Sequence, residues 1–174
     1  MNLRPTVDIA HPLHIGHYAP VAWSVVELDL GLVPDPSGSA EVLVADELMT
    51  MLVFMAWDTR ARSNVCAIAT FRGCVQAVFG YPNDEAWPGH PYFDVGTWTY
   101  GILEVVGSDW SNRLMEQNRV AFPASTQSAT RRHFIVACHE DVVELLAADV
   151  EVEAVPGSFE DALLTAVRRL TPST

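Results

Sequence analysis

One proline-rich stretch of the sequence concentrates groups that can exchange a proton or hold a ligand. Residues 80–92 read GYPNDEAWPGHPY, and their polar side chains are Tyr81, Asn83, Asp84, Glu85, His90 and Tyr92. Prolines stiffen such a loop, so its polar groups are held in place at little entropic cost, as a binding site requires. Asp84 or Glu85 and one of three histidines, His90, His133 or His139, could act as general base and acid. The alternative is a surface loop in which Asn83 and Asp84 make turn hydrogen bonds.

A second group of titratable residues lies along a predicted strand at 132–138 and just after it. His133 and His139 share one face of that strand with Ile135 and Ala137 between them, which is typical of a pocket wall. Strand spacing separates the two imidazoles by roughly 20 Å, too far for one metal, so each needs partners from elsewhere. The alternative is a buried histidine whose nitrogens are satisfied by a carboxylate or a carbonyl.

These two stretches lead to a functional hypothesis. We expect a small-molecule enzyme without an organic cofactor, with a pocket between the 81–90 loop and the 133–140 strand. Proton transfer would support a cyclisation, elimination, isomerisation or hydrolysis. The expected catalytic residues are Asp84, Glu85, His90, His133 and His139. The expected substrate-binding residues are Tyr81, Asn83, Trp87, Tyr92, Trp110 and Glu140, with Arg72 or Arg132 holding an anionic group.

The alternative function is a binding or interaction protein, such as an accessory subunit, a sensor or an immunity-type partner of a basic protein. It is favoured by the net charge of -12 and by the absence of any complete catalytic motif. Nothing in the sequence matches a phosphate loop, a dinucleotide fingerprint or a nucleophile elbow.

The remaining metal- and redox-type residues give little support for a cofactor. His11, His14 and His17 are spaced by three and are the candidate ligands for a divalent metal, although Pro12 and Gly16 argue against a helix there. The three cysteines, Cys66, Cys74 and Cys138, are expected to be reduced, the first two on one strand. Cys138 and His139 are strand neighbours that point to opposite faces, so a thiol nucleophile is not expected.

The elements that must position these residues are mostly strands. Alternating apolar positions predict a strand over 65–79, and further strands are expected at 21–30, 97–106 and 132–138. Residues 41–58 are expected to form one or two strands, with a buried helix at 48–57 as the alternative. Loops are expected at 32–40 and 80–96. A strand is expected at 142–152, with a helix at 142–149 as the alternative. Ser108 is expected to cap a helix at 109–119, on which Trp110, Leu114 and Met115 face inward. Ser158 and Asp161 are expected to cap a helix at 159–170. The predicted class is α+β, a mainly antiparallel, curved or barrel-like sheet with two short helices.

Composition favours one domain over all 174 residues, with residues 1–20 as an irregular entry segment. The 22 acidic against 10 basic residues argue against a broad nucleic-acid surface or an anionic membrane as partner. We expect a soluble, cytoplasmic protein, because there is no secretory signal and the longest apolar run, 48–57, is too short to span a bilayer. A homo-oligomer is left open.

The two site motifs together resemble a family of small bacterial proteins for which no activity is known to us. In that family a strand leads into a Tyr-Pro-Asn-Asp-Glu-Ala loop with Gly-His-Pro shortly after. A later Arg-His-Phe strand ends in a histidine followed by an acid. The matching positions are 81–86, 89–91, 132–134 and 139–140, within a resemblance that covers about 71–149, and Glu140 stands where aspartate is expected. The resemblance implies that these positions form one site, without naming a reaction.

Overall fold

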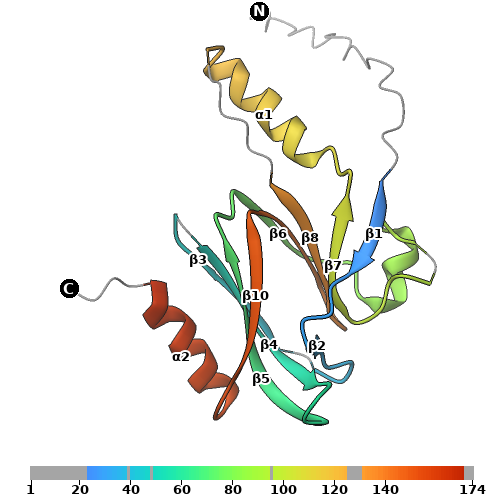
Figure 1. The fold of residues 1–174 in the computed structure, drawn as a ribbon, viewed down its shortest axis with the longest axis vertical. Coiled ribbons are helices and arrows are strands. Elements are labelled where there is room, and N and C mark those ends of the chain that lie inside the picture. Colours follow the sequence, from blue (N-terminus) through green and yellow to red (C-terminus); the bar gives the residue numbers. More distant parts are fainter. Residues whose placement is uncertain (1–22, 39, 48, 95, 125–130, 171–174) are drawn as a thin grey trace, which may run out of the picture.

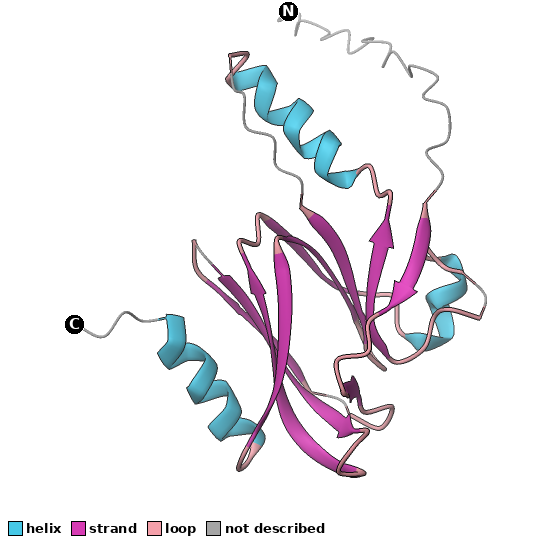
Figure 2. Ribbon diagram, viewed as in Figure 1, coloured by secondary structure: helices cyan, strands magenta, loops and turns pink. Residues whose placement is uncertain are grey.

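Two antiparallel sheets form the body of the protein in the computed structural model, which describes residues 23–38, 40–47, 49–94, 96–124 and 131–170 (Figure 1). Sheet A has the order β1 (Ser24–Glu27), β7 (Gly101–Val106), β8 (Arg132–Ala137), β9 (Val142–Ala147) and β6 (Gln76–Gly80). Sheet B has the order β10 (Asp149–Val155), β5 (Ser63–Arg72), β4 (Met49–Asp58) and β2 (Leu32–Pro34), with β3 (Glu41–Ala45) also paired to β4. The helical segments are η1 (Asp84–Gly89), α1 (Trp110–Ala121) and α2 (Phe159–Leu170) (Figure 2). The predicted α+β class with a curved antiparallel sheet is confirmed.

The main core lies between the two sheets. Alternate residues of β8 and β9, such as Phe134 and Leu145, pack against Phe54 and Phe71 of sheet B and are fully buried. The rings of Phe71 and Phe134 lie 5.8 Å apart, centroid to centroid. Because strand side chains alternate between faces, the remaining residues of β8 and β9 must point to the other face of sheet A.

Helix α2 covers the outer face of sheet B. Ala162 and Ala166 are buried in a cluster with Met51, Val53 and Ile68. The helix begins in the predicted reciprocal cap, with Ser158 N–H donating to Asp161 Oδ2 at 2.8 Å and Asp161 N–H donating to Ser158 Oγ at 3.2 Å.

The outer face of sheet A is covered by the loop between β6 and β7, residues 81–100, which we call the covering loop. Its aromatic residues Trp87 and Trp98 are buried against Leu103, Ile135 and Val142 of the sheet. This second apolar layer brings the polar residues of the covering loop against those of β8 and β9.

Several sequence predictions are corrected. The strand predicted over 65–79 is two strands in different sheets, because the chain turns at Gly73 with φ +57°, a conformation that suits glycine. Cys74 therefore lies outside β5, apart from Cys66, and all three cysteines are free. The predicted 32–40 loop contributes β2, and the 80–96 loop contains η1.

Other corrections concern the helices. Residues 142–149 are strand, so the helical alternative is wrong. Helix α1 has Asp109 as its N-cap instead of Ser108, and none of its residues is buried, so the inward face predicted for it is only half covered. No helix in the described part of the chain has the length and apolar character needed to cross a membrane.

Candidate functional site

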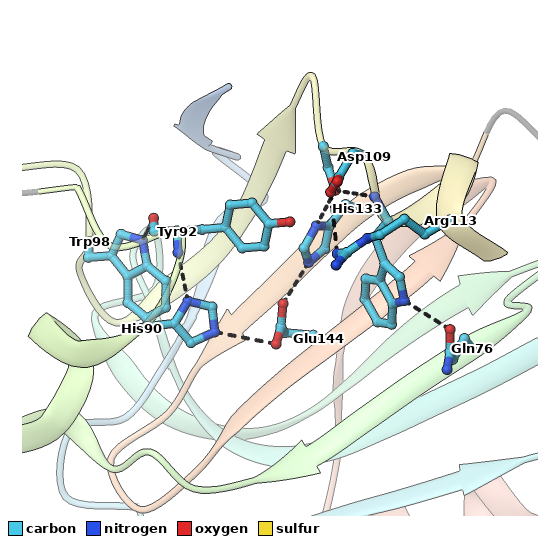
Figure 3. A network of polar contacts seen from close by, with 10 residues as sticks. Gln76, His90, Tyr92, Trp98, Asp109, Arg113, His133 and Glu144 are labelled. Carbon is cyan, nitrogen blue, oxygen red and sulfur yellow. Dashed lines mark hydrogen bonds and ion pairs between the residues drawn. The ribbon is translucent and has the colours of Figure 1, made fainter. Parts of the chain in front are cut away.

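Glu144 lies between two imidazoles on the covered face of sheet A (Figure 3). Nε2 of His133 is 2.9 Å from Oε2 of Glu144, and Nε2 of His90 is 3.3 Å from Oε1. One carboxylate thus joins a histidine of the covering loop to a histidine of β8.

The strand register explains the first of these contacts. His133 is paired with Leu146 and Glu144 with Ile135, so His133 and Glu144 are diagonal neighbours on the same face of sheet A. His90 reaches the carboxylate because it follows η1 directly, where its backbone N–H donates to the carbonyl of Trp87 at 2.8 Å.

The other nitrogen of each imidazole is also engaged. The backbone N–H of Tyr92 donates to Nδ1 of His90 at 3.2 Å, so the ring proton of His90 is on Nε2 and is donated to Glu144. Nδ1 of His133 is 2.9 Å from Ser108 Oγ. Ser108 Oγ also accepts the backbone N–H of Trp110 at 3.2 Å, which holds the hydroxyl in place beside His133.

Aromatic rings enclose the two imidazoles. Tyr92 and Trp110 lie edge-on to His133, with centroids at 5.0 and 4.8 Å, and Trp98 lies 4.8 Å from His90. Trp110 is fixed in turn by donating from Nε1 to Gln76 Oε1 at 2.9 Å. The side chains of His133 and His90 are only 1% and 4% exposed, so neither imidazole meets bulk water.

Glu144 carries a full negative charge at neutral pH. Burial raises the pKa of its carboxyl, but the hydrogen bonds and charges of His133 and His90 together lower it further, to about 2. The side chain of Glu144 is 22% exposed, and its carboxylate has more lone pairs than the two imidazoles use.

A hollow of about 360 Å³ opens beside this carboxylate. Its lining is mostly apolar: Val78, Tyr81, Pro82, Ala86, Gly89, Pro91 and Val142, with His90 and Glu144 as the polar residues. Volumes of this order and mostly apolar walls with few polar groups are typical of small-molecule sites. Glu144 is the carboxylate among these lining residues and could accept hydrogen bonds from a ligand.

A second polar centre lies near the start of η1. Oδ2 of Asp84 accepts hydrogen bonds from the Tyr100 hydroxyl and from Nδ1 of His139, the latter at 2.9 Å. The backbone also joins these segments, because Asp84 N–H donates to the His139 carbonyl at 3.0 Å. Glu140 Oε1 lies 3.5 Å from Nε2 of His139.

The pitch of η1 explains why the two centres are separate. In a 3₁₀ helix residues three apart share an edge. Ala86 and Gly89 line the hollow, whereas Asp84 and Trp87 are directed to Tyr100, whose ring is 5.1 Å from that of Trp87. The third edge is exposed and carries Glu85. The structure therefore brings together His90 and His133, and separately Asp84 and His139, but does not place Glu85 in either centre.

The two predicted anion-binding arginines do not line the hollow. Arg72 pairs with Glu151 at 2.9 Å on sheet B, and Arg132 pairs with Glu104 at 2.6 Å and with Asp149 at 3.2 Å. Both guanidinium groups therefore already have carboxylate partners.

The other predicted residues occupy varied positions. Tyr81 is 81% exposed at the rim of the hollow, Asn83 is the N-cap of η1, and Tyr92 and Trp110 pack on His133. His11, His14 and His17 lie outside the described residues, and among the described ones no group of three His, Cys, Asp or Glu side chains is arranged to hold a metal.

Sequence reasoning missed three residues of these centres. Glu144 had a detectable signal, because it is a lone carboxylate in an otherwise apolar strand, VVELLA. Ser108 was interpreted only as a helix cap, and Tyr100 had no distinguishing context in the sequence.

Comparison with known proteins adds no relationship: no protein-family model, curated protein or solved structure matches this chain.

Proposed function

We propose that this protein binds a small molecule in the hollow beside Glu144, and that the ligand carries a positively charged or hydrogen-bond-donating nitrogen on a compact apolar body. The observation that carries the proposal is the ionised, partly exposed carboxylate of Glu144, fixed by two imidazoles at the wall of a mostly apolar hollow.

The charge and hydrogen bonding of the site favour this class of ligand. Glu144 is ionised at neutral pH, so an ammonium group that donates to its carboxylate would form a charge-assisted hydrogen bond. An anion would be repelled, and the net charge of -12 adds to that discrimination at long range. The fixed geometry also means that little entropy is lost when the ligand binds.

The same contacts argue against an imidazole of this hollow as a general base. A general base needs a free lone pair within reach of the substrate, and both ring nitrogens of His90 and of His133 already have hydrogen-bond partners. Glu144, with a pKa of about 2, has too little affinity for a proton at neutral pH. The hollow therefore fits ligand recognition better than acid–base chemistry. The absence of a broad nucleic-acid partner remains part of the proposal on the grounds of charge. A cytoplasmic location remains part of it on the grounds of the free cysteines.

The test uses three benzyl compounds of nearly equal size at pH 7: benzylamine, benzyl alcohol and benzoate. Binding is followed by NMR through the backbone amide signals of the covering loop, which suits the millimolar affinities of such small ligands. We expect benzylamine to bind best and benzoate not to bind, with the shifted signals at Gly89 and at neighbours of Glu144.

Two variants test whether the carboxylate of Glu144 is the group that binds the ligand nitrogen. Glu144→Gln is expected to lower the affinity for benzylamine at least about tenfold, the effect of a lost charge-assisted hydrogen bond. Glu85→Gln removes the same charge from the exposed edge of η1 and is expected to leave binding unchanged. Glu144→Gln also removes the acceptor of both imidazoles and could disturb the site itself. The comparison of the three ligands on the unmodified protein therefore tests the proposal without that substitution. Three results would overturn the proposal: benzoate binds as tightly as benzylamine, none of the three compounds binds, or the two variants lose the same amount of affinity for benzylamine.

A further inference from the structure

His139 differs from the other two histidines that the structure describes. Its side chain is 38% exposed, and its Nε2 lies 3.5 Å from Oε1 of Glu140, a long distance for a hydrogen bond. Nδ1 is bound to Asp84 at 2.9 Å. A carboxylate on Nδ1 holds the ring proton there and leaves a lone pair on Nε2.

Asp84 is well suited to hold that tautomer. The Tyr100 hydroxyl, which donates to the same oxygen, lowers the pKa of Asp84, and the hydrogen bond and charge of His139 lower it further against the effect of burial. Burial and the neighbouring Asp84 raise the pKa of Tyr100 to about 12, so its hydroxyl keeps its proton and remains a donor. The carboxylate is therefore charged and oriented at neutral pH.

The same edge of η1 has unused hydrogen-bonding capacity. Oδ1 of Asp84 and Nε1 of Trp87 are buried and have no hydrogen-bond partner among the residues that the structure describes. The Trp87 side chain as a whole is more than nine-tenths buried. Buried polar atoms in proteins nearly always have a partner, and an unpaired acceptor and donor on one edge indicate a place where water or part of a bound molecule completes the set.

We propose that Asp84, His139 and Tyr100 form a general-base centre, distinct from the hollow at Glu144, that activates water for hydrolysis of an activated ester. This goes beyond the binding function proposed above. His139 is the catalytic residue, because its Nε2 takes the proton, and Asp84 and Tyr100 are positioning residues. Glu140 provides a negative charge near the imidazolium that forms.

The step balances with water as the only co-reactant. Nε2 of His139 takes a proton from water while the water oxygen forms a bond to the ester carbonyl carbon. The tetrahedral adduct then breaks its bond to the leaving oxygen, which departs with the electron pair. The imidazolium gives this proton to the leaving oxygen, so one ester and one water become one carboxylic acid and one alcohol or phenol.

The experiment follows hydrolysis of p-nitrophenyl acetate by the full-length protein at pH 7.5 through release of p-nitrophenolate. We expect a saturable rate, and we expect kcat to fall at least about tenfold in His139→Gln, the lower range of general-base contributions. Asp84→Asn should cause a comparable fall, because an amide nitrogen facing Nδ1 favours the wrong tautomer. The unmodified protein should react more slowly in D₂O, since a proton moves in the slow step.

Three controls separate this centre from other histidines and from the hollow. Glu85→Gln, next to Asp84 but exposed, should keep the full rate. A variant with His11, His14 and His17 all replaced by Gln should keep it too. His139→Gln should still bind benzylamine, which keeps failure here distinguishable from failure of the proposed function.

Four results would each overturn the proposal: no saturable hydrolysis, an unchanged rate in His139→Gln, a rate lost in the triple variant, or no slowing in D₂O. If Asp84→Asn fails to fold, Tyr100→Phe replaces it: the pH at which the rate is half-maximal should move, whereas a purely structural role would leave that pH unchanged.

Discussion

His133 and Glu144 lie diagonally across two paired strands, and Nε2 of the histidine is 2.9 Å from Oε2 of the carboxylate. The pair holds a charge at the boundary between a sheet and the loop that covers it, where His90 completes the arrangement from the other side. A carboxylate in this position has two consequences: a dependence of stability on pH, and a recognition group at the wall of a hollow.

Stability should depend on Glu144 in a defined pH window. Its pKa is about 2 in the folded protein against 4.5 for an ordinary glutamate, so the unfolded chain takes up the proton first as pH falls. The contribution is therefore complete above about pH 5 and is lost between about 4.5 and 2; it is on the order of 3 kcal/mol. Urea unfolding of the unmodified protein and Glu144→Gln at several pH values checks this. A difference between them that stays constant down to pH 2.5 would contradict the prediction.

Ser108→Ala should destabilise the protein by about 1 kcal/mol, because it removes the partner of His133 Nδ1 and the acceptor for the N–H of Trp110. Equilibrium urea unfolding at pH 7 measures this. Ser63→Ala, at the exposed first position of β5, is the matched control and should change stability little. Equal effects of the two substitutions would mean that the Ser108 contacts contribute nothing.

Tyr100→Phe should raise the pKa of Asp84 toward that of an ordinary aspartate. The hydroxyl is the largest cause of the lowered pKa, because its hydrogen bond stabilises the charged carboxylate. An NMR titration of the aspartate carboxyl carbons checks the shift, with Asp84→Asn to assign the signal. A midpoint unchanged by the substitution would show that the hydroxyl does not stabilise the carboxylate.

Gly157→Ala should cost about 1 kcal/mol or more. Gly157 has φ +104°, which L side chains rarely adopt, and an added Cβ would lie 2.6 Å from Asp161 Oδ2, within the cap of α2. Thermal unfolding measures the loss. Gly89→Ala is the control, because a Cβ there would have no atom within 4 Å. A Gly157→Ala protein as stable as that control would mean that the cap tolerates the added methyl group.

The fold class was predictable because local patterns carry it. Alternation along 132–138 and the apolar face of 159–170 gave elements that agree with β8 and α2. The turn at Gly73 was not predicted, because a glycine within an alternating pattern fits a bulge as well as a chain reversal. The sequence suggested no inter-strand register, and register is what makes Glu144 a neighbour of His133.

Part of the site was also predictable from local patterns. The types of residue on the covering loop and on β8 indicated a polar site, and the structure does place His90 near His133. Strand periodicity alone placed His139 on the same face as His133, but β8 ends at Ala137 and the chain turns, so His139 meets Asp84 instead. Partners that depend on where a strand ends are not encoded in its periodicity.

A crystal structure of the protein soaked in benzylamine tests the central claim most directly. The account predicts the ammonium nitrogen within hydrogen-bond distance of a Glu144 oxygen, with the ring against Val142 and Pro91 and both imidazoles still on the carboxylate. An empty hollow at saturating ligand, or a ring in the hollow with its nitrogen directed away from Glu144, would contradict it.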